Sequence, residues 1–205
     1  MFSDLEQIDT DLQRAAVSST VILDRLCVVN EETRKSSSYV DSNYIPFYYH
    51  LGKYITPKNL LEIGVNLGFF SSALFKSCKS VENYLAFQSS TTSFFSKRLM
   101  FSNVKSSYKN NFDYYMGSTE DVAFHEKVNF TKWDLVFLNE ERYYDKYAEV
   151  LDLAWDNLSE TGLIVMDNVI TNTASRDAFT SFSKNKNSKI FKTRYGTGVV
   201  SKESS

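Results

Sequence analysis

Two glycines, Gly64 and Gly68, lie four residues apart in the segment Asn59-Leu-Leu-Glu-Ile-Gly-Val-Asn-Leu-Gly-Phe-Phe-Ser71. The sequence has seven glycines in all, so two within one turn are informative. The apolar run before them ends near the acidic Glu62, and an apolar-periodic segment follows, which predicts strand, tight turn and helix. Glycine allows close approach of the backbone to a ligand, and the free N–H groups of a helix start attract negative charge. The segment indicates a nucleotide-type cofactor site, although an ordinary tight turn has the same glycine spacing.

Strands and helices are predicted to alternate beyond this turn, which indicates an α/β fold with a mostly parallel sheet. The predicted strands are 59–63, 84–87, 112–116, 133–138 and 163–166, and the predicted helices are 46–54, 69–77, 91–100, 143–157 and 174–183. A terminal hairpin is predicted at 190–194 and 199–201, and 104–108 competes with 112–116 for the third strand. Ligands of such sheets bind beyond the carboxyl ends of the strands. Those ends carry Glu62, Gln88, Gly117, Asn139 and Asp167.

The N-terminal region has the pattern of one long helix over residues 3 to about 33. Ser3 and Glu6 form a capping box, and apolar residues from Leu5 to Val29 follow at heptad spacing. This stripe either packs on the core of its own chain or joins copies into a homo-oligomer. We therefore expect an N-terminal helix and gate loop over 1–44 and a main domain over 45–205.

The bulk composition is that of a soluble globular protein with 205 residues, 42% hydrophobic and 23% charged. The formal net charge is -2, which argues against nucleic-acid partners and against binding to an anionic membrane. The two cysteines are too few for a disulfide scaffold, so a cytoplasmic location is expected. The abundance of Phe, Tyr, Ser, Asn and Lys is typical of an AT-rich source such as a phage or another virus.

Four segments together resemble the class I S-adenosylmethionine-dependent methyltransferases, and more narrowly the small O-methyltransferases of the catechol and caffeoyl-CoA type. These segments are 61–68, 116–121, 133–139 and 158–169. The resemblance covers about residues 45 to 202. It implies a Rossmann-like methyltransferase fold, in which a mostly parallel seven-stranded sheet has helices on both faces and ends in a C-terminal antiparallel hairpin.

The resemblance also implies S-adenosylmethionine as cofactor. The positions that would bind it are Glu62, Gly64, Asn66, Gly68, Gln88, Gly117, Ser118, Thr119 and Asn139. At the end of the second strand the family has an acidic residue that binds both ribose hydroxyls, and this chain has Gln88. An amide forms weaker hydrogen bonds than a carboxylate, so we expect reduced cofactor affinity.

Metal-dependent members of the family bind Mg²⁺ at positions that correspond to Asn139, Asp167 and Asn168. The family residue at the first position is aspartate, so Asn139 leaves Asp167 as the only charged ligand of the three. Affinity for hard cations rises with ligand charge, and we expect weak Mg²⁺ binding unless Glu140 or Glu141 contributes. The competing interpretation is an Asp-Asn turn that caps the next segment.

The family lysine proposed as general base corresponds to Arg142, and a guanidinium keeps its proton in proteins. Glu141 and Arg142 are therefore the predicted catalytic pair, with the carboxylate as base and Arg142 orienting an anionic substrate; Glu140 and His125 are alternative bases. The expected activity is methyl transfer to an oxygen, or less favourably a nitrogen, of a small-molecule substrate. The alternative is a catalytically inactive protein of the same fold with a structural or assembly role.

Overall fold

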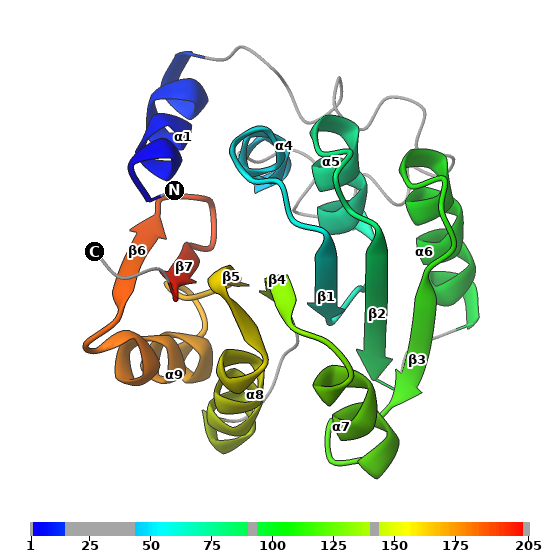
Figure 1. The fold of residues 1–205 in the computed structure, drawn as a ribbon. Coiled ribbons are helices and arrows are strands. Elements are labelled where there is room, and N and C mark those ends of the chain that lie inside the picture. Colours follow the sequence, from blue (N-terminus) through cyan, green and yellow to red (C-terminus); the bar gives the residue numbers. More distant parts are fainter. Residues whose placement is uncertain (1, 15–43, 90–93, 140–143, 203–205) are drawn as a thin grey trace. The chain divides into compact units, whose positions relative to one another are not determined.

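The computed structural model describes residues 2–14, 44–89, 94–139 and 144–202 (Figure 1). Within these ranges a seven-stranded sheet has the order β3-β2-β1-β4-β5-β7-β6. The strands are β1 (Asn59–Ile63), β2 (Asn83–Ser89), β3 (Asp113–Gly117), β4 (Trp133–Leu138), β5 (Leu158–Met166), β6 (Asn187–Phe191) and β7 (Thr197–Ser201). Strands β1 to β5 pair in parallel, whereas β7 pairs antiparallel with both β5 and β6. The predicted mostly parallel sheet with a C-terminal antiparallel hairpin is confirmed.

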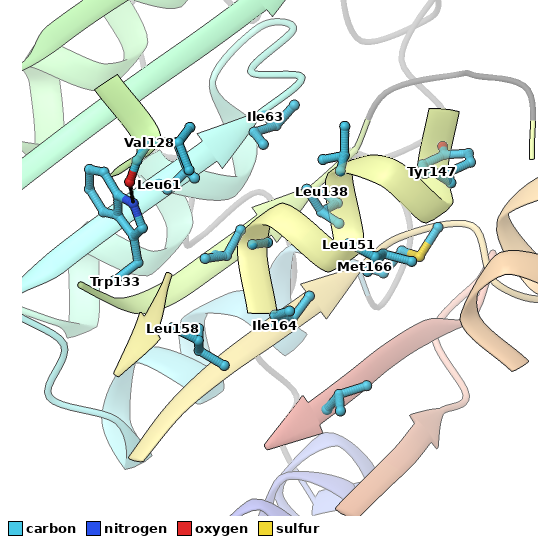
Figure 2. Packing of buried hydrophobic residues seen from close by; sticks show 14 of the residues in the cluster. Leu61, Ile63, Val128, Trp133, Leu138, Tyr147, Leu151, Leu158, Ile164 and Met166 are labelled. Carbon is cyan, nitrogen blue, oxygen red and sulfur yellow. Dashed lines mark hydrogen bonds between the residues drawn. The ribbon is translucent and has the colours of Figure 1, made fainter. Parts of the chain in front are cut away.

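The sheet belongs to a compact unit of residues 57–64, 81–90 and 112–205, whose described part also contains three helices. These are α7 (Val122–Asn129), α8 (Tyr144–Asp156) and α9 (Thr173–Ser183). Alternate residues of the strands pack against apolar residues of these helices in one buried cluster (Figure 2). Trp133 closes the cluster near α7, where its indole N–H donates to the Val128 carbonyl at 2.8 Å (Figure 2). The helices therefore cover one face of the sheet and fix the strand ends.

A second compact unit contains residues 1–56, 65–80 and 91–111. Its described helices are α1 (Phe2–Arg14), α4 (Tyr44–Tyr54), α5 (Phe69–Ser77) and α6 (Phe94–Ser107). Helix α1 packs against α4, with Leu5 and Ile8 fully buried. Asp11 of α1 accepts a hydrogen bond from the Tyr54 hydroxyl at 2.6 Å. The start of the predicted heptad stripe is thus buried within its own chain, whereas the remainder of that stripe, beyond Arg14, lies outside the described residues.

Three elements differ most from the sequence prediction in their bounds. Helix α6 runs on to Ser107, because Val104 and Tyr108 are both buried one helical turn apart and the Tyr108 N–H donates to the Val104 carbonyl. Strand β5 begins at Leu158, and a register shift against β4 accommodates its exposed residues 160–161. Strand β6 lies at the sheet edge and begins at the polar Asn187. Its first residues do not alternate between buried apolar and exposed polar positions, so the sequence did not indicate where the strand begins. No helix in the described ranges is long and apolar enough to span a membrane.

Candidate functional site

At the carboxyl edge of the sheet, the first residue after each central strand is also held by a backbone hydrogen bond to a neighbouring strand. We call these residues the edge row. Three bonds form it: Gly64 N–H to Phe87 O (3.0 Å), Asn139 N–H to Ile63 O (2.8 Å) and Asp167 N–H to Leu138 O (3.0 Å). Phe87 pairs with Ile63 in the parallel register. Gln88 follows Phe87 and therefore lies beside Gly64, which follows Ile63. The structure therefore brings Gly64, Gln88, Asn139 and Asp167 together along one edge, as the strand pattern predicted.

Glu62, just behind this edge, and Gln88, on the edge, are buried polar residues with exposures of 0% and 7%. The Tyr84 hydroxyl donates a hydrogen bond to the Glu62 carboxylate. A carboxylate buried in this way is held in one orientation by its partner. Tyr84 was not among the predicted site residues, because its link to Glu62 crosses from β1 to β2.

The turn after β3 holds the predicted residues Gly117, Ser118 and Thr119. Asp121 organises this turn, since its Oδ2 accepts from the Ser118 N–H at 2.8 Å and from the Tyr115 hydroxyl at 2.9 Å. That hydrogen bond to the carboxylate, followed by desolvation, raises the pKa of Tyr115. A Cβ at position 117 would collide with the Asp121 carboxylate, so a side chain there would displace Asp121 from this turn. Asp121 belongs to the motif that the sequence revealed, but its role depends on contacts that only the structure shows.

The glycine loop after β1 lies in the other unit from Val65 onward. Asn66 and Gly68 have positive φ values of 49° and 72°, and the Gly68 N–H donates to Val65 O at 2.8 Å. Gly68 is the N-cap of α5 and, as a glycine, has no side chain with which to cap the helix. The predicted strand, turn and helix are confirmed.

The predicted metal ligands Asn139, Asp167 and Asn168 are neighbours at the sheet edge, but their chemistry suits Mg²⁺ poorly. Asp167 is 1% exposed, and Asn168, at φ 62°, donates its side-chain N–H to Asp167 Oδ2 at 3.3 Å. Among the described residues, no three His, Cys, Asp or Glu side chains gather as a metal site. The structure therefore gives no support for bound Mg²⁺.

The predicted catalytic residues Glu141 and Arg142 lie outside the described residues, as does Glu140. His125, the alternative base, is exposed on α7. The other histidine, His50, is buried in α4, where its Nδ1 lies 3.3 Å from Asp11 Oδ2. Base catalysis by Glu141 stays a prediction.

Residues 61–169, more than half of the chain, match a family model described as "Methyltransferase domain". A search of curated proteins finds no match. Among solved structures, the chain is similar to a putative O-methyltransferase from Klebsiella pneumoniae (TM-score 0.70, 16% identity, covering 97% of each chain). It is also similar to an O-methyltransferase from Bacillus cereus in complex with SAH (TM-score 0.68, 15% identity, covering 98% of this chain and 100% of the other).

A third similar structure is the O-methyltransferase TomG from Streptomyces achromogenes in complex with SAM (TM-score 0.69, 13% identity, covering 97% of this chain and 96% of the other). At these identities the likeness concerns the fold, and it agrees with the sheet order described above. The matched family segment includes the end of β1, the glycine loop and the Asp167–Asn168 pair. The chain belongs to the methyltransferase domain family and has the class I methyltransferase fold.

Proposed function

We propose that this protein transfers a methyl group from S-adenosylmethionine to an oxygen atom of a small-molecule acceptor. The observation that carries the proposal is the hydrogen-bonded row of Gly64, Asn139 and Asp167 beside Gln88, at the edge where α/β sheets bind ligands. Family membership and the SAM- and SAH-bound structures of similar fold support the choice of cofactor. When bound, S-adenosylmethionine supplies an electrophilic methyl group on a positively charged sulfur.

The residues of the edge fit such a cofactor through hydrogen bonding. Gln88 has an amide that can accept from one ribose hydroxyl and donate to another, although without the negative charge of the acidic residue found in the family. The glycine loop has positive φ values at Asn66 and Gly68 and lets the backbone approach a ligand closely. Ser118 and Thr119 lie in a turn that Asp121 holds rigid, which suits a site for the base of the nucleoside.

Methyl transfer requires alignment of donor and acceptor, and alignment alone lowers the barrier substantially. The single carboxylate among Asn139, Asp167 and Asn168 does not fit a tightly bound Mg²⁺, so no step depends on the metal. We propose that the Glu141 carboxylate accepts the acceptor's hydroxyl proton, and that Arg142 orients an acceptor with negative charge. Arg142 itself keeps its proton and cannot act as base.

The test is calorimetric titration of the full-length protein with S-adenosylhomocysteine, with adenosine triphosphate as a control nucleotide. We expect saturable one-site binding of S-adenosylhomocysteine and none of the control. Transfer of label from methyl-labelled S-adenosylmethionine to a panel of phenols and phenolic acids then tests catalysis. No heat at millimolar S-adenosylhomocysteine would reject the proposal and leave the alternative of an inactive protein with a structural role. Binding without labelled product from any acceptor in the panel would reject the proposed substrate class.

Two further expectations from the sequence remain proposals. We propose a cytoplasmic location, for which the low cysteine content is the support. We also propose that residues beyond Arg14 of the heptad stripe can join two copies, because Leu5 and Ile8 are already buried within one chain. Sedimentation of the full-length protein beside a variant that starts at Ser36 tests this second proposal, and an unchanged mass would reject it.

A further inference from the structure

Asn103, which no sequence motif marked, connects helix α6 to the glycine loop. Its side-chain Nδ2 donates a hydrogen bond to the Leu67 carbonyl at 2.8 Å, across 36 residues of sequence. The residue is 1% exposed and lies inside the helix, where asparagine is unfavourable because its amide competes with the backbone. A buried asparagine within a helix therefore calls for a specific partner, and the Leu67 carbonyl is that partner.

The bond matters because it fixes a peptide group that is also held at its other end. The peptide that joins Leu67 to Gly68 is planar, so its carbonyl and its N–H point in opposite directions. Asn103 binds the carbonyl, and Val65 O accepts the Gly68 N–H at 2.8 Å. With both ends engaged, this peptide plane cannot rotate without breaking a hydrogen bond. The orientation of Gly68, the N-cap of α5, is thereby set.

Packing from the same helix restricts the loop further. A Cβ built on Gly68 would lie 3.0 Å from Val104 Cγ2 and 3.4 Å from the Met100 carbonyl oxygen. The other end of the Asn103 amide, Oδ1, is buried and makes no hydrogen bond to any residue that the structure describes. A buried acceptor of this kind lowers stability, so an apolar residue would suit the helix better on packing grounds alone. The hydrogen bond to Leu67 is what an apolar residue cannot provide.

We propose that Asn103 is a positioning residue for cofactor binding, which holds the glycine loop in the conformation that accepts S-adenosylmethionine. This inference rests on the proposed function, since it assigns the loop to the cofactor. It adds a residue of α6 to the residues that hold the glycine loop. Loss of the Asn103 donor therefore reduces the free energy of cofactor binding by more than it reduces the free energy of unfolding.

The experiment compares full-length variants at position 103 with a matched control in the other unit. Asn103→Leu and Asn103→Ser remove the donor, and Asn103→Asp places a carboxylate against the Leu67 carbonyl. The control is Asn157→Asp, because Asn157 is also buried (8% exposed) and also donates to a backbone carbonyl, Leu153 O, at 3.0 Å. Each variant is assayed for melting temperature and for the Kd of S-adenosylhomocysteine.

We expect Asn103→Leu and Asn103→Ser to raise the Kd about tenfold, whereas Asn157→Asp lowers the melting temperature without changing the Kd. Asn103→Asp supplies a readout that a merely structural role would not move. As pH falls, its carboxyl becomes protonated and can donate to Leu67 O, so its affinity relative to wild type recovers. Folded variants that bind like wild type, or an Asn103→Asp defect that is independent of pH, would overturn the inference alone. Failure of the wild type to bind would instead reject the proposed function.

Discussion

Asp167 and Asn139 are neighbours at the sheet edge, because the Asp167 N–H donates to the carbonyl of the residue before Asn139 at 3.0 Å. This relationship places an amide, rather than a second carboxylate, beside Asp167, and hard cations bind carboxylates more tightly than amides. The predicted metal ligands fit Mg²⁺ poorly because, of the three, only Asp167 carries a negative charge. The substitution therefore gives a direct experiment.

Asn139→Asp should raise the affinity for Mg²⁺ roughly tenfold, because it adds a second carboxylate beside Asp167. Calorimetric titration with Mg²⁺ measures the change. Asn110→Asp, at an exposed position, adds the same charge away from the edge and should leave Mg²⁺ affinity unaltered. Equal Mg²⁺ affinity in wild type and Asn139→Asp would show that these residues do not form a metal site even in a weakened form.

Gln88→Glu should tighten S-adenosylhomocysteine binding by about fivefold to tenfold. The physical reason is that a carboxylate accepts charge-assisted hydrogen bonds from the ribose hydroxyls, which are stronger than those of an amide. Calorimetry on both proteins gives the ratio of Kd values, and Asn110→Asp again controls for net charge. A weaker or unchanged Kd would mean that Gln88 does not contact the ribose.

Gly68→Ala should lower the free energy of unfolding by about 1–2 kcal/mol, because alanine at φ 72° is strained. It should also weaken S-adenosylhomocysteine binding, since relief of strain moves the glycine loop. Denaturant unfolding and calorimetry measure the two effects. Gly196→Ala is the matched control, with φ 77° in a different turn, and should lose stability while the cofactor Kd is retained. A cofactor Kd unchanged in Gly68→Ala would contradict a role for this loop.

Stability should decrease as the pH is lowered from about 7.5 to about 5, because His50 is buried as a neutral side chain. Burial lowers the pKa of His50 below 6.5, the nearby Lys53 lowers it further, and Asp11 partly opposes both. The unfolded chain therefore takes up a proton at higher pH than the folded chain. The contribution is complete above pH 6.5 and is lost as the pH falls towards the folded pKa.

Urea unfolding at several pH values measures this dependence, and the two histidines provide their own control. His50→Gln should flatten the slope, whereas the exposed His125→Gln should retain it. The pKa of Asp11 is lowered chiefly by its hydrogen bond from Tyr54, so its contribution is lost only below about pH 3.8, outside this range. A slope that persists in His50→Gln would assign the pH dependence to other groups.

The bounds of β1 and β4 were predicted correctly to the residue, because each strand is a buried apolar run with distinct ends. The prediction failed where the strand lies at an edge: in β6 the apolar Ile190 is 43% exposed, so hydrophobic alternation does not mark the start at Asn187. It also ended α6 too early, because the buried spacing of Val104 and Tyr108 was not read as helical. Local patterns thus identify central elements better than edges and helix ends.

For the site, strand ends were predictable because the carboxyl ends of parallel strands meet on one edge. The supporting residues were not, since each acts through a partner that is distant in sequence or set by local geometry. Tyr84 reaches Glu62 from the next strand, and Asn103 reaches Leu67 from α6. Asn103 lies beyond residue 100, where the predicted helix ended, so the sequence prediction did not mark it as an asparagine inside a helix.

Amide hydrogen exchange with and without S-adenosylhomocysteine tests most directly whether the cofactor binds at the carboxyl edge of the parallel strands. Bound cofactor should slow exchange of the amides at 64–68, 88–89, 117–119 and 139, while α9 and β6 stay unaffected. Protection confined to other segments, or no protection at saturating S-adenosylhomocysteine, would contradict the placement of the site.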